Sequence, residues 1–299
     1  MIAVMGGSGN VGGKVADVLL HEGQDVRVFG RSAERLEPLG RRGAEVAVGD
    51  AMRLDDLQML FKDAVSALVV LPDNVADPHY VANRSEMSRA ITQALRDQRV
   101  GHIVFASSIG ADRDRGVGPV AGLHELEELL FGLEEANVLS LRAAMHMEQN
   151  LLGSIPMIKE QKVNGGVIKG DLRFPMIATI DIAQRAAGHL AHREFFGHTV
   201  ETILGPKDVT MNEVTLALGA ALGIPNLPYV EFPPDGVRAA LQGAGVSEEF
   251  ASLLVEMQLA VNEGRMMDEV ERRAETITPT RVDEFLGTAL GPIGTPTPG

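Results

Sequence analysis

Residues 1–20, MIAVMGGSGNVGGKVADVLL, decide the fold of this chain. Their first part, Ile2–Met5, is a short apolar run typical of a buried strand, and apolar residues recur at helical spacing from Val11 to Leu19. Five glycines, at positions 6, 7, 9, 12 and 13, lie between these two patterns, and residues 7–12 satisfy G-x-G-x-x-G. A glycine turn that follows a strand and opens a helix predicts a dinucleotide-binding site.

The chemistry of such a site explains the glycines. Glycine permits the tight turn, lets the backbone approach a pyrophosphate, and lets the helix pack closely on the strand. The start of the helix offers free N–H groups and the positive end of its dipole to the phosphates. We therefore expect the diphosphate to bind the turn through Gly6, Ser8, Gly9, Asn10, Val11 and Gly12. The motif does not end in Lys-Ser or Lys-Thr, which excludes a Walker-type phosphate loop; a flexible turn that binds nothing is the alternative.

The end of the second predicted strand, Asp25–Phe29, indicates which cofactor binds. A site that selects NAD carries a carboxylate there, which holds the ribose 2′-hydroxyl. This chain has Gly30 and Arg31 instead; Arg31 can bind a 2′-phosphate and Ser32 can add a hydroxyl, with Arg35 one helical turn further on. We therefore expect NADP(H) to be preferred over NAD(H), although a solvated helix face would also explain arginines here.

Composition excludes several classes of function. The chain has 299 residues, no cysteine, and a net charge of −14 from 41 acidic and 27 basic residues. The charge argues against a nucleic-acid partner, and the missing cysteines rule out disulfides, thiolate metal ligands and a cysteine nucleophile. No signal peptide or membrane-length apolar stretch stands out, so we expect a cytoplasmic protein that does not bind membranes. The three histidines 189, 192 and 198 lack the accompanying carboxylates of a metal site, and we predict no bound metal.

Strand and helix patterns alternate through the first half of the chain. The predicted strands are Ile2–Met5, Asp25–Phe29, Ala44–Val48, Ala64–Leu71, His102–Ala106 and Val138–Arg142, with helices between them. This alternation predicts a parallel sheet with helices on both faces. After about residue 153 the rhythm loosens, and strand-like pieces at Gly166–Lys169, Val200–Leu204 and Pro228–Phe232 mix with helical patterns.

The predicted fold class is α/β: a Rossmann-like, doubly wound parallel sheet with a smaller C-terminal α+β lobe. We expect an NADP-binding domain over residues 1–152 and a smaller substrate-binding lobe over residues 153–290, whose elements can interleave with the first domain. Residues 291–299, GPIGTPTPG, are expected to form a disordered tail.

Seven stretches spread over the chain match one family pattern. They are VMGGSGNVGGKV (4–15), VGD (48–50), HIVFASSIGA (102–111), HELEELL (124–130), LRAAMHMEQNLL (141–152), TIDIAQRAAGHL (179–190) and LGPKDVTMNEVTLALGAALG (204–223). Together they resemble the atypical short-chain dehydrogenases/reductases, and within these the NmrA-like branch.

The resemblance implies a Rossmann-like domain with a substrate cleft between it and the smaller lobe. It also implies cofactor contacts at Asp50 and Ala51 near the adenine, at Leu71 and Pro72 after the fourth strand, and at Ser107 and Ser108 after the fifth.

One departure from the wider superfamily bears on catalysis. Typical short-chain dehydrogenases carry Tyr-x-x-x-Lys on the helix after the fifth strand, where the aligned positions here look like Val120 and His124. The chain has only two tyrosines; Tyr80 is followed four residues later by Arg84, but well before that helix, and Tyr229 lies far beyond it. The tyrosine–lysine dyad is therefore absent.

Two histidines are candidate catalytic residues. His124 could bind the cofactor ribose or donate a proton, because histidine titrates near neutrality; alternatively it is a solvated residue beside Glu125, Glu127 and Glu128. His146 lies in a segment that borders the substrate cleft in relatives and could hydrogen-bond a carbonyl or quinone oxygen, or simply cap or pack a helix. The sequence leaves both alternatives open. Four methionines are candidates for an adaptable apolar pocket or for core filling: Met145, Met147, Met157 and Met176.

These features favour an NADPH-dependent reductase that transfers hydride to a small uncharged acceptor of the quinone, enone, carbonyl or azo type. The first alternative is a non-catalytic NADP(H)-binding redox sensor, and the second is a non-redox enzyme on the same fold. An apolar cleft in an acidic chain favours a small apolar or aromatic substrate over an anionic one. A monomer or homodimer is expected.

Overall fold

The computed structural model describes residues 1–268 and 270–291. The expected disordered tail lies outside the described residues, apart from Gly291. Among the described residues, no helix combines the length and the apolar character that crossing a bilayer requires.

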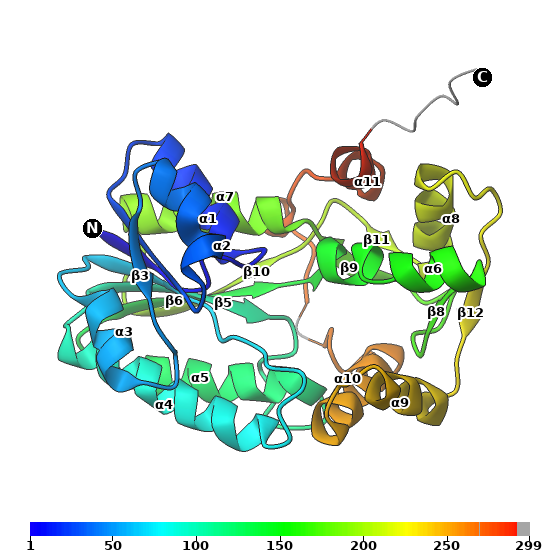
Figure 1. Ribbon diagram of the computed structural model, residues 1–299, viewed down its shortest axis with the longest axis horizontal. Helices are drawn as coiled ribbons and strands as arrows, with labels where there is room; N and C mark the ends of the chain where they lie inside the picture. Colours follow the sequence, from blue (N-terminus) through cyan, green and yellow to red (C-terminus); the bar gives the residue numbers. More distant parts are fainter. Residues whose placement is uncertain (269, 292–299) are drawn as a thin grey trace.

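A seven-stranded sheet forms the centre of the larger part of the molecule (Figure 1). Its strands are β1 (Ile2–Val4), β2 (Val26–Gly30), β3 (Glu45–Val48), β4 (Ser66–Val69), β5 (His102–Ser108), β6 (Asn137–Ala143) and β10 (His198–Ile203). They pair in the order β10-β6-β5-β4-β1-β2-β3, and every pair is parallel. Strands three-two-one-four-five-six in this order are the doubly wound arrangement, so the predicted α/β fold class is confirmed.

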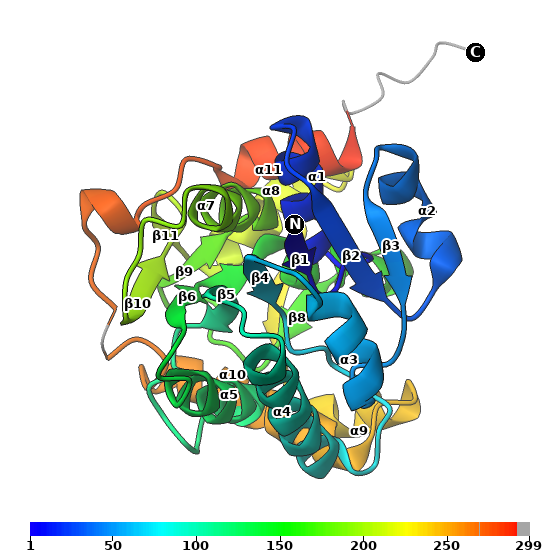
Figure 2. The same cartoon turned by 90° about the vertical axis from the view of Figure 1, so that its left-hand side faces the viewer.

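Helices cover both faces of this sheet, three on each (Figure 2). One face carries α1 (Gly12–His21), α2 (Ala33–Arg41) and α7 (Thr179–His192), and the other carries α3 (Leu54–Phe61), α4 (Tyr80–Asp97) and α5 (Ala121–Phe131). Right-handed crossovers through these helices bring every strand into the sheet in the same direction, so all carboxyl ends lie on one edge.

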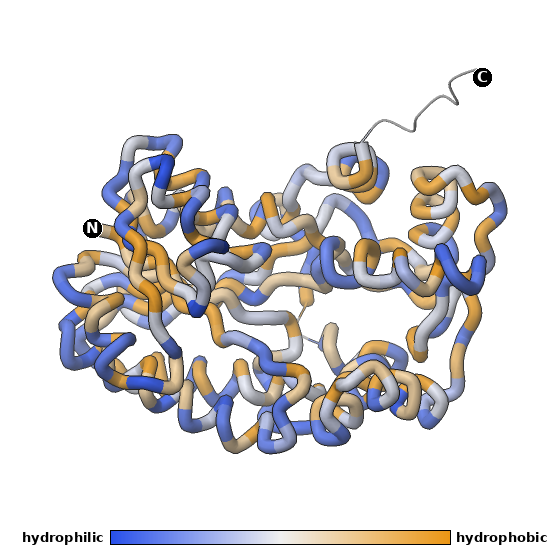
Figure 3. Tube along the Cα trace, in the orientation of Figure 1, coloured by the Kyte–Doolittle hydropathy of each residue, from blue (hydrophilic) through white to orange (hydrophobic). Residues whose placement is uncertain are grey.

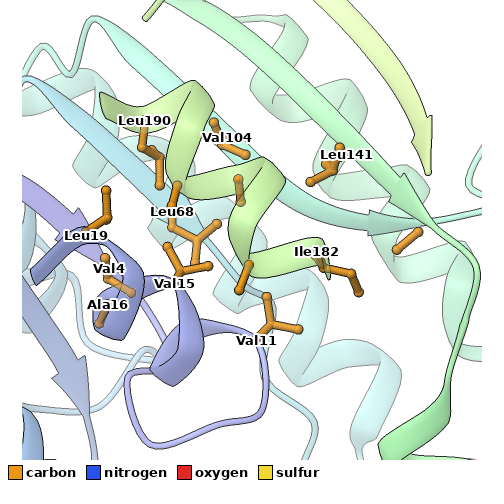
Figure 4. Packing of buried hydrophobic residues seen from close by; sticks show 14 of the residues in the cluster. Val4, Val11, Val15, Ala16, Leu19, Leu68, Val104, Leu141, Ile182 and Leu190 are labelled. Atoms are coloured by element: carbon orange, nitrogen blue, oxygen red, sulfur yellow. The ribbon is translucent and has the colours of Figure 1, made fainter. Parts of the chain in front are cut away.

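The packing between sheet and helices explains the apolar patterns of the sequence. Val15 and Leu19 of α1 are fully buried against Val4 and Leu68 of the sheet, and Leu190 of α7 belongs to the same cluster (Figure 4). Hydropathy colouring follows this arrangement, with hydrophobic central strands and hydrophilic outer turns (Figure 3). Strands covered on both faces read as continuous apolar runs, which is why β4 is buried along its whole length.

The rest of the chain forms a smaller part beside the carboxyl edge of the sheet. Its small sheets are β7 (Met145–His146) with β9 (Phe174–Ile177) and β11 (Asp208–Val209), and β8 (Asn164–Gly166) with β12 (Tyr229–Glu231). Its helices are α6 (Ile155–Gln161), α8 (Met211–Ala221), α9 (Pro234–Gly243), α10 (Glu248–Asn262) and α11 (Val282–Leu290), together with η1 (Gly118–Val120), η2 (Glu148–Leu152) and η3 (Ala274–Thr276). A separate apolar cluster fills this part.

The main sheet does not end near residue 152. The strand-like stretch expected at Val200–Leu204 is β10, the seventh strand of the main sheet, where it pairs in parallel with β6. Helix α7, which precedes β10 in the chain, packs against α1 on the sheet face. Of the other two strand-like stretches, Pro228–Phe232 contains β12, whereas β8 overlaps Gly166–Lys169 only at Gly166.

Candidate cofactor and substrate cavity

A cavity of about 1030 Å³ opens at the carboxyl ends of the parallel strands. Its walls come from the turns after β1 to β6 on the sheet side, and from β7, β9 and α10 of the smaller part. Ligand pockets measure about 300–1,000 Å³, so this cavity is at the upper end of their range. Doubly wound sheets bind their ligands at this edge.

The glycine turn forms one end of the cavity. Gly6 has φ +67°, a left-handed conformation that favours glycine, and a Cβ on Gly12 would lie 2.5 Å from the carbonyl oxygen of Gly6. The turn is therefore tight, and the start of helix α1 packs against the backbone that directly follows β1. Among the described residues, the amides of Asn10, Val11 and Gly12 donate to no protein oxygen. Free amides at a helix start, with no Cβ in front of them, fit a diphosphate group.

Two arginines line the cavity beyond the end of β2. Arg31 is exposed there, and Arg35 reaches back across the glycine turn, where its Nη2 donates to the carbonyl oxygen of Ser8 at 3.0 Å. Ser32 is the N-cap of α2; its Oγ accepts from the amide of Arg35 at 3.3 Å, and it does not line the cavity. The structure thus brings Arg31 to the cavity with Arg35, whereas Ser32 starts the helix that carries Arg35.

The other expected cofactor residues on this side all line the cavity. They are Asp50 and Ala51 after β3 and Leu71 and Pro72 after β4. Asp50 shapes its own turn, because its Oδ1 accepts from the amide of Met52 at 3.0 Å. Ala51 and Leu71 are buried, so this wall is apolar on both sides of the exposed carboxylate.

Ser107 and Ser108 line the cavity at the end of β5, as expected. Ser107 Oγ donates to Glu127 Oε1 at 2.5 Å, and Ser108 Oγ donates to the carbonyl oxygen of Ile109 at 3.0 Å. Both hydroxyl hydrogens are therefore held by protein acceptors. The lone pairs of these oxygens remain available to a ligand in the cavity.

The partner of Ser107 is Glu127 of α5, for which the sequence analysis predicted no role. Its side chain is buried, with 1% exposed. Ser140 of β6 donates to it as well, and Arg142 of β6 binds it through two nitrogens, at 3.1 and 2.7 Å. A buried carboxylate is stable only with such partners. The polar residues inside strand β6 are the sequence signal of this network.

His124 does not line the cavity. Its Nδ1 lies 2.9 Å from the carbonyl oxygen of Ala111, so this nitrogen carries the hydrogen and donates it. Val120 and Leu123 face the cavity from this stretch instead. The ring of His124 thus links α5 to the loop after β5, and it is only partly buried.

His146 lines the cavity from β7, with Gln149 and Asn150 of the following π-helical segment η2. The amide nitrogen of Asn150 donates to the carbonyl oxygen of His146 at 2.9 Å and so fixes the backbone there. Burial lowers the pKa of His146; Glu148 raises it and Lys14 lowers it, with a net decrease. The imidazole is therefore neutral at neutral pH and can donate one hydrogen bond.

A partly buried ion pair that the sequence did not reveal joins α1 to η2 and α7. Lys14 Nζ lies 3.1 Å from Glu148 Oε1 and 2.6 Å from Thr179 Oγ1. The amide and hydroxyl of Thr179 also donate to Glu148. Burial raises the pKa of Glu148, but the hydrogen bonds from Thr179 and Lys14 outweigh it, and the pKa is lowered. The sequence signals were a lysine directly after the glycine motif and a carboxylate in an apolar segment.

The wall that the smaller part contributes to the cavity has no charged side chain among its described residues. All six charged side chains among the described lining residues belong to residues 31–84. Apart from His146, this wall consists mainly of apolar side chains and a few uncharged amide side chains. The apolar ones include Met145, Phe174, Phe250, Leu254, Met257, Met266 and Met267, and the amides are Gln149, Asn150 and Gln258.

Methionines do line this wall, but mostly other ones than the four candidates. Met145 is in the lining, whereas Met147 and Met176 are fully buried in the core of the smaller part. Met157 of α6 is outside the lining. The sequence left both a pocket wall and core filling open for these methionines, because helical and strand periodicity does not tell one from the other; Met147 and Met176 fill the core.

Tyr80 and Arg84, on helix α4, line the cavity too. Tyr80 Oη donates to Asp73 Oδ1 at 2.5 Å, and Arg84 Nη1 donates to Tyr80 Oη. Arg84 Nη1 also lies 3.2 Å from Asp73 Oδ1 and 3.1 Å from the carbonyl oxygen of Pro119. Burial raises the pKa of Tyr80 far above its ordinary value. The sequence analysis noted this pair but gave it no role, because it lies well before the helix that carries the dyad in typical short-chain dehydrogenases.

The three histidines at positions 189, 192 and 198 do not line the cavity. His189 Nε2 lies 2.8 Å from Glu201 Oε2, which Arg185 also binds. Within the described part of the chain, no three metal-ligating side chains come together.

Comparisons with known proteins agree with this geometry. Residues 6–137 match the family model described as NAD(P)H-binding. The chain is 26% identical over 263 residues to the NAD(P)H azoreductase of Xenophilus azovorans, covering 86% of each protein. The match confirms the resemblance that the sequence motifs indicated.

Solved structures share the fold over nearly the full length. The NADPH-dependent quinone oxidoreductase of Escherichia coli, solved in complex with NADPH, superposes with a TM-score of 0.80 at 20% identity, covering 97% of this chain and 100% of that one. The triphenylmethane reductase of a Citrobacter species gives a TM-score of 0.76 at 22% identity, covering 97% and 99%. At these identities the likeness establishes the fold.

Proposed function

We propose that the protein is an NADPH-dependent reductase of a small uncharged acceptor, a proposal supported by the match of residues 6–137 to the family model described as NAD(P)H-binding. One observation carries the proposal: the unpaired amides at the start of α1 and the apolar wall formed by the smaller part line the same cavity.

The cofactor end of the cavity supports NADPH in particular. The free amides of Asn10, Val11 and Gly12 would hold the diphosphate, and Arg31 with Arg35 would hold the 2′-phosphate. Asp50 and Ala51 would border the adenine. An NAD-selecting site requires a carboxylate directly after β2, and this chain has none there.

The opposite end supports an acceptor without charge. When bound, NADPH supplies a hydride, so the protein has to hold an acceptor beside the nicotinamide and exclude water from it. Phenylalanine and methionine side chains give a flat, adaptable apolar surface. The neutral imidazole of His146 would donate a hydrogen bond to an acceptor oxygen or nitrogen.

Known relatives favour the same class of acceptors. The azoreductase, quinone oxidoreductase and triphenylmethane reductase that this chain resembles are all named for uncharged or delocalised aromatic acceptors. We extend that class to this protein as quinones, enones, carbonyls or azo compounds, held at the wall formed by β7, β9 and α10.

Purified protein, NADPH and a panel of quinones, enones and azo dyes test the proposal. Acceptor-dependent loss of the NADPH absorbance, faster than with NADH, is the expected result. Tight NADPH binding with no oxidation by any acceptor would refute the reductase and favour an NADP(H) sensor.

A further inference from the structure

Helix α5, which carries the tyrosine and lysine of the dyad in typical relatives, presents only apolar side chains to the cavity in this chain. Val120 and Leu123 are the described residues that face it from this stretch. Helix α4 supplies the missing chemistry from the side. Its Arg84 reaches the start of α5, where Nη1 donates to the carbonyl oxygen of Pro119, the residue before Val120.

The approach of Arg84 depends on a small residue of α5. A Cβ on Gly122 would lie 3.6 Å from Cζ of Arg84, so the guanidinium packs directly over the backbone there. Arg84 is 6% exposed, and it lies over the ring of Tyr80 with its Cζ 5.1 Å from the ring centroid. A phenol and a cation therefore stand together in the cavity wall, next to the position where the dyad stands in typical relatives.

We propose that Tyr80 is the proton donor of this reductase and that Arg84 takes the place of the lysine of the missing dyad. The inference rests on the proposed function and names the residues that complete it. Helix α4 thus carries a Tyr-x-x-x-Arg pair in place of the Tyr-x-x-x-Lys pair of α5.

The hydrogen bonds of Tyr80 set the direction of proton flow. Its hydroxyl donates to Asp73, whose side chain is 43% exposed and reaches solvent. Its oxygen accepts from Arg84, which stabilises negative charge on the phenol oxygen. Burial and the Asp73 carboxylate raise the pKa of Tyr80 more than Arg84 lowers it, so the phenol is protonated at neutral pH.

The step balances as follows. The hydride brings two electrons and one proton to the acceptor, which leaves a negative charge on an acceptor oxygen or nitrogen. The Oη–H bond of Tyr80 breaks, a new O–H or N–H bond forms on that atom, and the phenolate is held by Arg84. A proton from water, passed by Asp73, then restores the phenol.

Other polar groups in the wall are less suited to give a proton. Like Tyr80, Ser107 and Ser108 donate to protein acceptors, but the partner of Ser107 is the buried Glu127 and that of Ser108 is a backbone carbonyl oxygen, and neither can pass a proton in from solvent. Tyr80, in contrast, stands between a cation and a solvent-exposed carboxylate. The ring of Phe250, 4.8 Å away edge to face, holds the phenol in position from α10.

Tyr80→Phe is the direct test, because it keeps the ring and its contact with Phe250. We expect kcat with NADPH and menadione to fall about 100-fold, the usual size of a general-acid contribution, with NADPH affinity unchanged. The solvent deuterium isotope effect on kcat should change as well. Tyr229→Phe is the matched control, since its partly buried hydroxyl donates to the carbonyl oxygen of Ile168 outside the cavity.

Arg84 is tested by a pair of variants. Arg84→Met should lose kcat to a similar degree, and Arg84→Lys, which keeps the cation, should restore part of it. Equal loss in both, with a lowered unfolding midpoint, would mean that Arg84 only supports the structure and would overturn its assigned role.

A readout without turnover uses the two tyrosines of the chain. Tyrosine labelled with ¹³C at Cζ gives two resonances, which Tyr80→Phe and Tyr229→Phe assign. Adding menadione to the NADP⁺ complex should shift the Tyr80 signal and leave that of Tyr229 in place. An unmoved Tyr80 signal would show that the phenol does not meet the acceptor and would refute the inference.

The two proposals fail in different ways. A wild-type protein that never oxidises NADPH with any acceptor contradicts the proposed function. An active wild type whose Tyr80→Phe variant is equally active leaves the reductase intact and contradicts only the proton donor.

Discussion

Replacing Gly12 by alanine perturbs the contact on which cofactor binding depends. A Cβ there would lie 2.5 Å from the carbonyl oxygen of Gly6, and ordinary contact begins near 3.4 Å, so the start of α1 has to retreat by about 0.9 Å. Overpacking of this kind costs about 1–3 kcal/mol of stability. The retreat also moves the amides of Asn10 and Val11, and losing one hydrogen bond to a charged phosphate weakens binding roughly 10- to 100-fold.

Two measurements read this prediction: a urea unfolding curve and a calorimetric titration with NADPH. Gly188→Ala is the matched control, because this glycine lies inside α7 with nothing within 4 Å of its added Cβ. That variant should gain about 0.5–1 kcal/mol and bind NADPH normally. A Gly12→Ala protein with the wild-type urea midpoint and the wild-type affinity would refute the reasoning from the glycine turn.

Three further substitutions test separate parts of the site. Arg31→Glu should weaken NADPH binding by about tenfold or more while sparing NADH, because one donor to the 2′-phosphate becomes a like charge. Arg41→Glu, at the end of the helix that follows Arg31 and outside the cavity, should leave the NADPH-to-NADH affinity ratio unchanged, and an equal ratio in both variants would rule out the assignment. Glu148→Gln should cost about 2 kcal/mol at pH 7, measured by urea unfolding. Since the folded pKa of Glu148 lies below its ordinary value near 4.5, its contribution is present above that pH and is lost as the pH falls through the folded pKa, so a stability gap that persisted at lower pH would argue against it. His146→Phe should lower kcat/KM for quinones about tenfold with NADPH affinity unchanged, and wild-type kinetics in this variant would exclude a hydrogen bond to the acceptor.

Local patterns predicted most of the fold. The run Ile2–Met5, the glycine turn and the alternation of strands and helices are signals within a few residues of each other, and the structure follows them. The place of β10 in the main sheet was not predicted. This strand pairs in parallel with β6, about 60 residues earlier in the chain, and the sequence of His198–Ile203 does not indicate which strand it pairs with. Its sheet membership comes from tertiary packing, with α7 covering it on the face shared with α1.

Some residues of the site could likewise be predicted from local patterns, and others could not. The glycine turn and Arg31 were predictable because their chemistry depends on a short motif after a strand. Tyr80 and Arg84 were visible as a pair but were assigned no role, because the side of α4 that meets α5 is set by helix packing. Glu127 was given no role for a related reason, since its burial depends on donors from two neighbouring strands.

Single-turnover oxidation of NADPH, deuterated at either face of C4, tests the central claim most directly. The account predicts that mixing the protein–NADPH complex with a quinone oxidises the cofactor, and that deuterium at one face slows the step while deuterium at the other does not. Oxidation at the same rate with both labels, or none at all, would contradict a cavity that holds the nicotinamide in one orientation against its acceptor.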